Sequence, residues 1–540
     1  MPTHSTRCAG GPRDERRSPN AGRPVTGKPP TGGGEQPDFS ADSTHRPNGG
    51  DERKRPQRAG RDAMFRKLVE DIELWHGNDG RGYATIEIND HREHWPVLGG
   101  AFAKWLRLRA QLNGEPMLGA MEIGKLTENL EARCLLLGQL HNICHRVGWH
   151  DGKIYVDLAD DQWRAVEIVP AKPDTTQRWR IVDRPPVRLL RTSGMRSMPA
   201  PAPGGTIDDL RQWMNVKSEA DLRLTIAWVL NCYRDRGPFP VLGIQGGQGS
   251  GKSTLARLLM RFTDPQEADL RSPPKEERDL WVATQHARVL AYDNLSSISA
   301  GLADAFCRIS TGGAQAERTL HSNTDETILR ACRPLMLNAI VDIVRRPDLA
   351  DRAIQVEAKR LTGRWRTEEE FWAEFEQEEP LLLGAIFDAL SFALGNYKQT
   401  TVPANLRMAD CARWAEAPAP SLNWRPGELS VWWQQNRASG DLTIIEGDIV
   451  AAPLVAFLDG QGDRWEGATG ELLTRLEETV NDKVRRSKYW PVNVHGLRST
   501  LDRLQTSLGT VGWTFEREKG TRGARKLIFT RIESESENPA

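Results

Sequence analysis

Apolar residues follow first a helical and then an alternating spacing in the segment after residue 63. Helical spacing covers residues 102–112 and 126–147, and alternation typical of strands covers residues 153–158, 163–169 and 179–182. This order predicts a mixed α+β domain over residues 63–205, which ends in a linker rich in Pro and Gly.

The pattern changes again after residue 205. Short apolar strands alternate with helical stretches from residue 241 to 356, which predicts an α/β sheet within a domain at residues 206–365. A strongly helical block follows, and residues 366–440 are expected to form a lid or collar. Residues 441–535 show helices followed by a hairpin, so we expect a small C-terminal domain there.

The first 62 residues have a different composition. Residues 1–60 contain 10 Gly and 9 Pro, with only Met1, Val25 and Phe39 as sizeable apolar groups. Such a segment buries too little apolar surface to offset its ordering entropy, so we expect a disordered tail.

Composition excludes several classes of protein. The 540 residues carry 73 basic and 73 acidic side chains, so net charge indicates no polyanionic partner. Seven cysteines without a C-x-x-C pair argue against a disulfide scaffold or a zinc ribbon. No run of 18 apolar residues and no apolar signal core occur, so we expect a cytoplasmic protein without a membrane span.

A phosphate-binding motif is the strongest chemical signal in the chain. Residues 246–253 read G-x-x-x-x-G-K-S, between an apolar strand at 241–244 and a helix at 254–262. Glycines let backbone N–H groups curl around phosphate oxygens, and the helix N-terminus favours negative charge. The motif predicts ATP binding with Mg²⁺. The binding residues would be Gly246, Gly247, Gln248, Gly249, Ser250, Gly251, Lys252, Ser253 and Thr254, with Lys252 on the β- and γ-phosphates and Ser253 on the metal.

Two further strands end in polar residues that suit the same site. Asp293 ends the strand at 288–293 and is expected to hold Mg²⁺, and Asn338 follows the strand at 334–337 within reach of the γ-phosphate or the attacking water. The residue after Asp293 is Asn294, where a second carboxylate would be expected. An amide orients water but does not accept its proton, so we expect ATP binding with slow turnover.

Arg352 is a candidate for action between subunits. A cation in residues 345–352 could neutralise transition-state charge on a neighbouring subunit's ATP. The alternative is an ion pair within the fold.

These segments, in this order, resemble the superfamily 3 helicase core of phage, viral and plasmid primase–helicases, within the AAA+ class. The likeness is carried by residues 246–254, 289–294, 309–321 and 335–338. The resemblance implies a P-loop ATPase core, a homo-oligomeric ring (a hexamer) and an arginine finger at Arg352. It also implies a hairpin that contacts single-stranded DNA in the ring channel through Arg318 and His321. Asn294 and the few basic residues of the hairpin depart from the family pattern, and residues 64–200 contain no paired-aspartate primase motif.

The C-terminal region is locally basic. Residues 483–531 hold 12 Arg or Lys against three acids. Helices followed by a basic hairpin resemble a winged-helix domain, which implies duplex contact through Arg498 and Arg503 on a helix and Arg522 and Arg525 on the wing. The alternative is a solvated charged face.

Together these features predict an ATP-dependent DNA helicase or translocase of a mobile element or prophage that acts in replication. Two alternatives remain: a regulatory P-loop protein in which ATP switches DNA binding, and a DNA-binding adapter with a vestigial nucleotide site.

Overall fold

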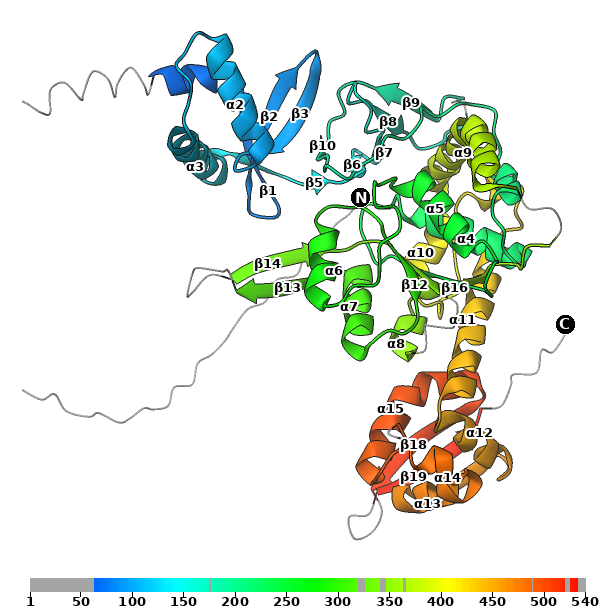
Figure 1. Ribbon diagram of the computed structural model, residues 1–540. Helices are drawn as coiled ribbons and strands as arrows, with labels where there is room; N and C mark the ends of the chain where they lie inside the picture. The colour runs from blue at the N-terminus through cyan, green and yellow to red at the C-terminus, as the bar shows by residue number, and fades with distance from the viewer. Residues whose placement is uncertain are drawn as a thin grey trace, which may run out of the picture. The chain divides into compact units, whose positions relative to one another are not determined.

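The computed structural model describes residues 63–173, 176–318, 326–339, 346–362, 366–487, 489–519 and 525–532, which form a mixed α/β structure (Figure 1). From Met64 onward the chain clusters into a single unit. The predicted tail at residues 1–62 lies outside the described residues. Among the described helices, none combines the length and apolar character that crossing a bilayer requires.

The first sheet has the strand order β3-β2-β1-β4, with β4 parallel to β1 and the other neighbours antiparallel. Its strands are β1 (Glu73–Gly77), β2 (Gly82–Ile88), β3 (His91–Pro96) and β4 (Gln139–His141), and its helices are α2 (Gly100–Leu112) and α3 (Ala120–Leu137). Helix α3 buries Ile123, Leu126 and Leu130, whose spacing of three to four residues fits one helix face.

The prediction of one helix over residues 126–147 is wrong beyond Leu137. At Gly138 the backbone changes from helical to extended, and β4 and β5 (Ile143–Cys144) follow. A Cβ atom on Gly138 would lie 2.4 Å from the Cys134 carbonyl oxygen and 2.9 Å from the Trp75 Cα atom. Only glycine therefore lets the chain leave the helix so close to β1.

A second, antiparallel sheet has the order β6-β7-β8-β9. Its strands are β6 (Val147–His150), β7 (Lys153–Asp157), β8 (Ala165–Ile168) and β9 (Trp179–Val182), and β10 (Arg188–Leu189) pairs with β5. The last three strands of this sheet confirm the predicted strands. Asp151 and Gly152, both at positive φ, form the two-residue turn between β6 and β7.

The central sheet is parallel throughout, with the order β12-β15-β11-β16. Its strands are β11 (Val241–Gln245), β12 (Leu290–Leu295), β15 (Leu335–Ala339) and β16 (Ala353–Glu357). The buried runs of the two inner strands, β11 and β15, are typical of parallel sheets covered by helices. The covering helices include α4 (Glu219–Asn231), α5 (Lys252–Thr263), α6 (Glu277–Thr284) and α7 (Ala300–Thr311). Since β15 lies between β11 and β12, the carboxyl ends of these three strands are neighbours.

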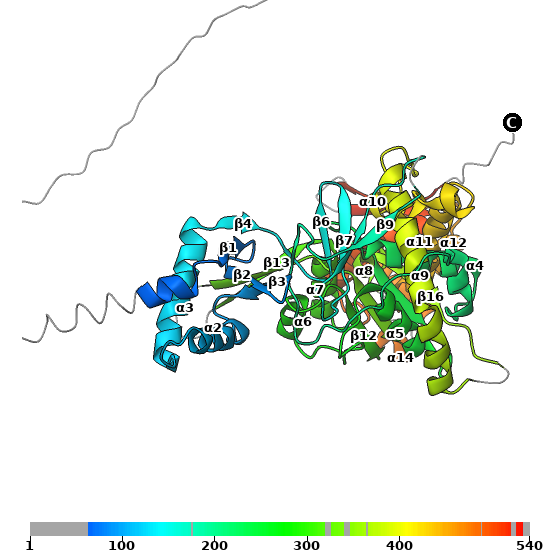
Figure 2. The same ribbon diagram turned by 90° about the horizontal axis from the view of Figure 1, so that it is seen from above.

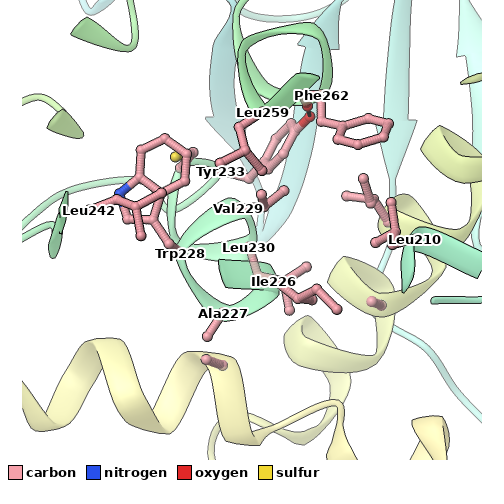
Figure 3. Close-up of a cluster of buried hydrophobic side chains, with 14 of the residues drawn as sticks. Leu210, Ile226, Ala227, Trp228, Val229, Leu230, Tyr233, Leu242, Leu259 and Phe262 are labelled. Carbon is pink, nitrogen blue, oxygen red and sulfur yellow. Dashed lines mark hydrogen bonds between the residues drawn. The ribbon is translucent and has the colours of Figure 1, made fainter. Parts of the chain in front are cut away.

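The core packs α4 and α5 against this sheet (Figure 3). Trp228 and Leu242 are fully buried, and the Trp228 Nε1–H donates to the Pro240 carbonyl at 3.0 Å. Tyr233 donates its hydroxyl to the Phe262 carbonyl at the end of α5. Each such large side chain contributes about 1.5–3 kcal/mol by burial, which fixes α5 and the loop before it.

A hairpin precedes β15. Strands β13 (Gly313–Arg318) and β14 (Glu326–Ala331) pair in antiparallel register from Gly313 opposite Ala331 to Arg318 opposite Glu326. In both views the hairpin extends away from α6 and α7 (Figures 1 and 2). Its tip at residues 319–325, which includes His321, lies outside the described residues.

The helices after β16 confirm the predicted helical block. They are α9 (Glu368–Asn396), α10 (Ala409–Glu416) and α11 (Glu428–Gly447). Helix α11 continues past the predicted boundary at residue 440 and contacts both β16 and α15. Asn436 fastens it to β16 by accepting from the Gln355 N–H and donating to the Gln355 carbonyl.

The C-terminal region combines four helices with a three-stranded antiparallel sheet of order β17-β19-β18. The elements are α12 (Ala451–Asp459), β17 (Arg464–Ala468), α13 (Thr469–Thr479), α14 (Asp482–Arg485), α15 (Val494–Thr510), β18 (Trp513–Lys519) and β19 (Arg525–Arg531). Helix α15 fully buries four leucines whose spacing of three to four residues fits one helix face: Leu497, Leu501, Leu504 and Leu508.

Candidate functional site

The loop at residues 246–251 joins β11 to α5 in a conformation that only glycine adopts freely. Gly246, Gly249 and Gly251 have φ values of 151°, 75° and 72°. A Cβ atom on Gly246 would also lie 2.8 Å from Ser250 Oγ and 2.9 Å from the Ala358 carbonyl oxygen. The loop leads directly into α5, whose first N–H groups have no helical partner, so its mouth favours an anion.

Lys252, the first residue of α5, forms hydrogen bonds to the backbone of this loop. Its Nζ donates to the Gly246 and Gly247 carbonyls at 2.8 and 2.9 Å. Burial lowers the pKa of Lys252, while the Asp293 carboxylate opposes that shift. A phosphate oxygen would give this amine a charged partner in place of two neutral carbonyls.

Ser253, Asp293 and Asn338 meet at the carboxyl ends of the three neighbouring strands. The Ser253 hydroxyl lies 3.0 and 3.3 Å from the two Asp293 carboxylate oxygens. Asn338 donates its Nδ2 to Asp293 Oδ1 at 2.5 Å and to Ser253 Oγ at 3.3 Å. Asn338 reaches both because β15 is inserted between the strands that carry the other two groups.

One polar atom of this cluster is unsatisfied. Asn338 is 1% exposed, and its Oδ1 is buried without a hydrogen-bond partner among the described residues. A buried polar atom without a partner costs about 1–3 kcal/mol. A hydroxyl, a carboxylate and an unpartnered amide oxygen fit the oxygen ligands and ordered waters of Mg²⁺.

The local backbone conformation gives a reason why residue 294 is an asparagine. Its φ is 56°, and the pairing of β12 with β15 shifts register between Tyr292 and Leu295. Asparagine tolerates this left-handed conformation better than glutamate does. The Asn294 N–H donates to Asp293 Oδ1 at 2.8 Å, so the irregular strand end also orients the carboxylate.

Arg352 lies at the opposite end of the sheet from the loop. It precedes β16, and its carbonyl accepts from the Val241 N–H at the start of β11. The loop follows the other end of β11, about 15 Å away at 3.3 Å per residue. Arg352 donates to the Asp348 carbonyl, its Nε is buried without a partner among the described residues, and Arg346 pairs with Asp304 at 2.9 Å.

Asn215 belongs to this site, although sequence reasoning missed it. Its Nδ2 donates to the Ser250 carbonyl at 2.9 Å and to the Lys359 carbonyl at 2.6 Å. The Lys359 N–H donates back to the Asn215 carbonyl at 3.2 Å. Asn215 thus joins the glycine loop, through Ser250, to the segment after β16, through Lys359. No local motif marks this residue, because its partners are 35 and 144 positions away.

The basic C-terminal window is largely paired. Arg503 contacts Asp448, Arg517 contacts Asp502 and Lys526 contacts Glu466, each at 2.7 Å. Two of these acids precede residue 483 and so escaped the charge count. Arg498 is partly buried and forms no ion pair with a described residue, and its carbonyl accepts from Arg517 Nη2 at 3.3 Å.

Other predicted DNA contacts lie at the margins of the described chain. Arg318 is the last residue of β13 and Arg525 the first of β19, and the described structure gives only their backbone. His321 and Arg522 lie outside the described residues. The site therefore joins Lys252, Ser253, Asp293 and Asn338 in one cluster. Arg352, Arg498 and Arg503 contact other parts of the described chain.

Two family models match the chain. Residues 207–419 match the Actinomycete integrative conjugative element replication protein, and residues 450–538 match the AICE RepA C-terminal domain. Together the two segments span more than half of the chain. No curated protein matches the chain significantly.

Two solved structures illustrate what this chain is similar to in fold. "SCCmec type IV Cch - active helicase" is 12% identical, with a TM-score of 0.43, over 86% of this chain and 93% of that one. "The A form apo structure of NrS-1 C terminal region-CTR" is 11% identical, with a TM-score of 0.36, over 87% and 99%. Similarity at this level supports no inference about chemistry.

Proposed function

We propose that this chain, whose two matched segments belong to the replication proteins of actinomycete integrative conjugative elements, is an ATP-dependent DNA helicase or translocase that acts in replication. The observation that carries the proposal is the meeting of Lys252, Ser253, Asp293 and Asn338 at one edge of a parallel sheet. These residues bring a cation, a hydroxyl, a carboxylate and an amide to the mouth of a glycine loop.

Each residue has a defined task in this proposal. Lys252 leaves the loop carbonyls and binds the β- and γ-phosphates of ATP, while residues 246–254 enclose the phosphates. Ser253 and Asp293 would hold Mg²⁺, which would supply positive charge to neutralise the phosphates. Asn338 directs its amide at the attacking water or the γ-phosphate. The fold proposed for this domain is that of a P-loop ATPase of the AAA+ class.

The position of Arg352 favours an oligomer. Since Arg352 lies at the amino end of the sheet, it is remote from the loop of its own subunit, so a role of Arg352 in hydrolysis would be toward the ATP of a neighbour. A homo-oligomeric ring, by the resemblance a hexamer, places this arginine against the next ATP. Arg318 and His321, which the resemblance assigns to the channel hairpin, would then follow one DNA strand through the channel.

The C-terminal region provides the duplex-binding part of the proposal. Helices α13 and α15 with strands β18 and β19 have the element order of a winged-helix domain. In that arrangement Arg498 and Arg503 belong to the helix and Arg522 and Arg525 to the wing.

A mixing experiment tests the ring. Arg352→Ala should bind ATP normally and hydrolyse it about 10³-fold more slowly, the scale found for arginine fingers. Mixing this variant with Lys252→Ala should restore part of the activity, because some interfaces then join an intact Lys252 to an intact Arg352. Absence of rescue in verified mixed oligomers would contradict action between subunits.

Asn294 favours a second candidate function, an ATP-switched regulatory DNA-binding protein without translocation. The left-handed backbone at Asn294 disfavours a general base there, so turnover would be slow. Strand displacement on a forked substrate separates the two candidates, since only a translocating motor displaces the strand.

A further inference from the structure

We propose that the turn leading from α14 into α15, described at residues 486–487 and 489–493, forms a duplex-DNA contact of the C-terminal region together with Lys483 on α14. This inference rests on the DNA-binding part of the proposed function and deepens it. It assigns four residues without a role so far: Lys483, Arg486, Tyr489 and Val492.

The turn is fixed from inside. Trp490 is 4% exposed and Pro491 is buried, while Tyr489 and Val492 on either side are 72% and 91% exposed. Gly496 in the first turn of α15 packs on Pro491, where an added Cβ would lie 3.4 Å from the Pro491 Cβ. Asn493 caps α15 by accepting from the Gly496 N–H at 3.0 Å.

Two apolar side chains are thus held outward by a turn that the core anchors. A flexible turn could fold such groups back against the protein, whereas this one keeps them in solvent. Apolar area that stays in solvent is available for burial by a binding partner.

The cations of this region fall into two sets. Lys483 and Arg486 are exposed, and neither forms an ion pair with a described residue. Arg517 and Lys526, in contrast, each contact a carboxylate at 2.7 Å. The acid beside the turn is Asp482, which is 76% exposed and lies 3.8 Å from Arg485. Among the cations over residues 483–531 whose side chains the structure describes, Arg498 on α15 also forms no ion pair, but it is partly buried. Lys483 and Arg486 are therefore the exposed ones, and both are close in the sequence to the exposed Tyr489 and Val492.

This combination fits duplex DNA. Unpaired cations contact phosphates, and exposed apolar side chains contact sugars and thymine methyl groups at base edges. The turn leads into the N-terminal end of α15, the end that enters the major groove in helix-turn-helix proteins. A stable protein interface would need about 800 Å² on each partner, far more than two apolar side chains provide.

The test measures duplex binding by the full-length protein at several salt concentrations. Lys483→Ala with Arg486→Ala should weaken binding and reduce the log–log salt slope by about two, at roughly 0.9 for each lost phosphate contact. Arg517→Ala with Lys526→Ala removes the same charge from paired positions and should leave the slope unchanged. Tyr489→Ala with Val492→Ala should weaken binding at every salt concentration without changing the slope.

Circular dichroism and DNA-free ATPase activity should be the same in all three variants, since none of the changed side chains belongs to the glycine loop or to the cluster at its mouth. A reduced slope in the paired variant with an unchanged slope in the turn variant would overturn the assignment. Loss of single-strand binding alone, or of oligomerisation alone, in the turn variants would overturn it in favour of those partners. Failure of the unaltered protein to bind duplex DNA would instead contradict the proposed function itself.

Discussion

Helix α5 has a cluster of buried polar groups at each end, and the two clusters differ in how completely they are satisfied. At its C-terminal end, Asp264 accepts from Arg146 Nε at 3.0 Å and from the Arg288 and Val289 N–H groups at 2.7 and 3.2 Å. Arg146 also donates to the carbonyls of Asp157, Arg196 and Pro265. Both side chains of the Arg146–Asp264 pair are 0% exposed.

The cluster at the N-terminal end of α5 is open by comparison. Asn338 Oδ1 has no partner among the described residues, and Lys252 donates only to neutral carbonyls. A saturated cluster has no capacity left for a ligand, so it serves the fold. An unsaturated cluster at a loop mouth has polar groups that can still bind a ligand, as a binding site requires.

The largest effect is expected at the closed cluster. Asp264→Asn removes the charge that compensates Arg146 and should lower the free energy of unfolding by about 3–5 kcal/mol. Chemical denaturation measures this loss. Arg146→Met in the Asp264→Asn background should recover part of the stability, because no uncompensated charge remains. An Asp264→Asn protein as stable as the unaltered one would remove the basis of the comparison.

At the open cluster we expect a large effect on ATP hydrolysis and a small effect on the free energy of unfolding. Asp293→Asn keeps the shape of the side chain but removes its charge, so ATP hydrolysis should fall by about 10²–10³-fold. The free energy of unfolding without nucleotide should change by less than about 1 kcal/mol. In the unaltered protein, Mg²⁺–ATP at 100 times its Kd should add about 2.7 kcal/mol of stability.

Thermal unfolding with ATP, in the presence of Mg²⁺ or of a chelator, measures the metal-dependent part of that gain. The Asp293→Asn protein should lose this part. If it instead unfolded as easily as the Asp264 variant, the two clusters would not differ in kind.

The smallest effect is expected at the tether of the loop. Asn215→Ala removes two hydrogen bonds to carbonyls and should weaken ATP binding several-fold, at about 0.5–1.5 kcal/mol for each bond. Gln212→Ala is a matched control, since Gln212 lies nearby and contacts Glu378 in place of the loop. Equal ATP affinities in the two variants would mean that the loop keeps its shape without Asn215.

Much of the candidate site could be predicted from the sequence, because its signals are local. A glycine loop between an apolar strand and a helix, and polar residues at the ends of apolar strands, identified Lys252, Ser253, Asp293 and Asn338. Another local signal, the alternation of apolar and polar residues, predicted the strands at residues 153–158, 163–169 and 179–182.

The missed features depend on contacts between distant segments. Apolar spacing alone does not show that Gly138 must pack against Trp75, so the helix at residues 126–147 was extended too far. The ion pairs of Arg503 and Lys526 join residues 55 and 60 positions apart, and no count over a sequence window reveals them. Asn215 escaped for the same reason.

The position of Arg352 at the far end of β16 has a kinetic consequence. If one subunit supplies the glycine loop and its neighbour supplies the arginine, an isolated chain holds only half of a complete ATPase site. Hydrolysis would then depend on more than the first power of protein concentration at high dilution, and the specific activity would reach a plateau once the subunits are assembled. Assembly on the DNA of the element would itself switch on ATP consumption, and dispersed chains in the cell would leave the ATP pool untouched.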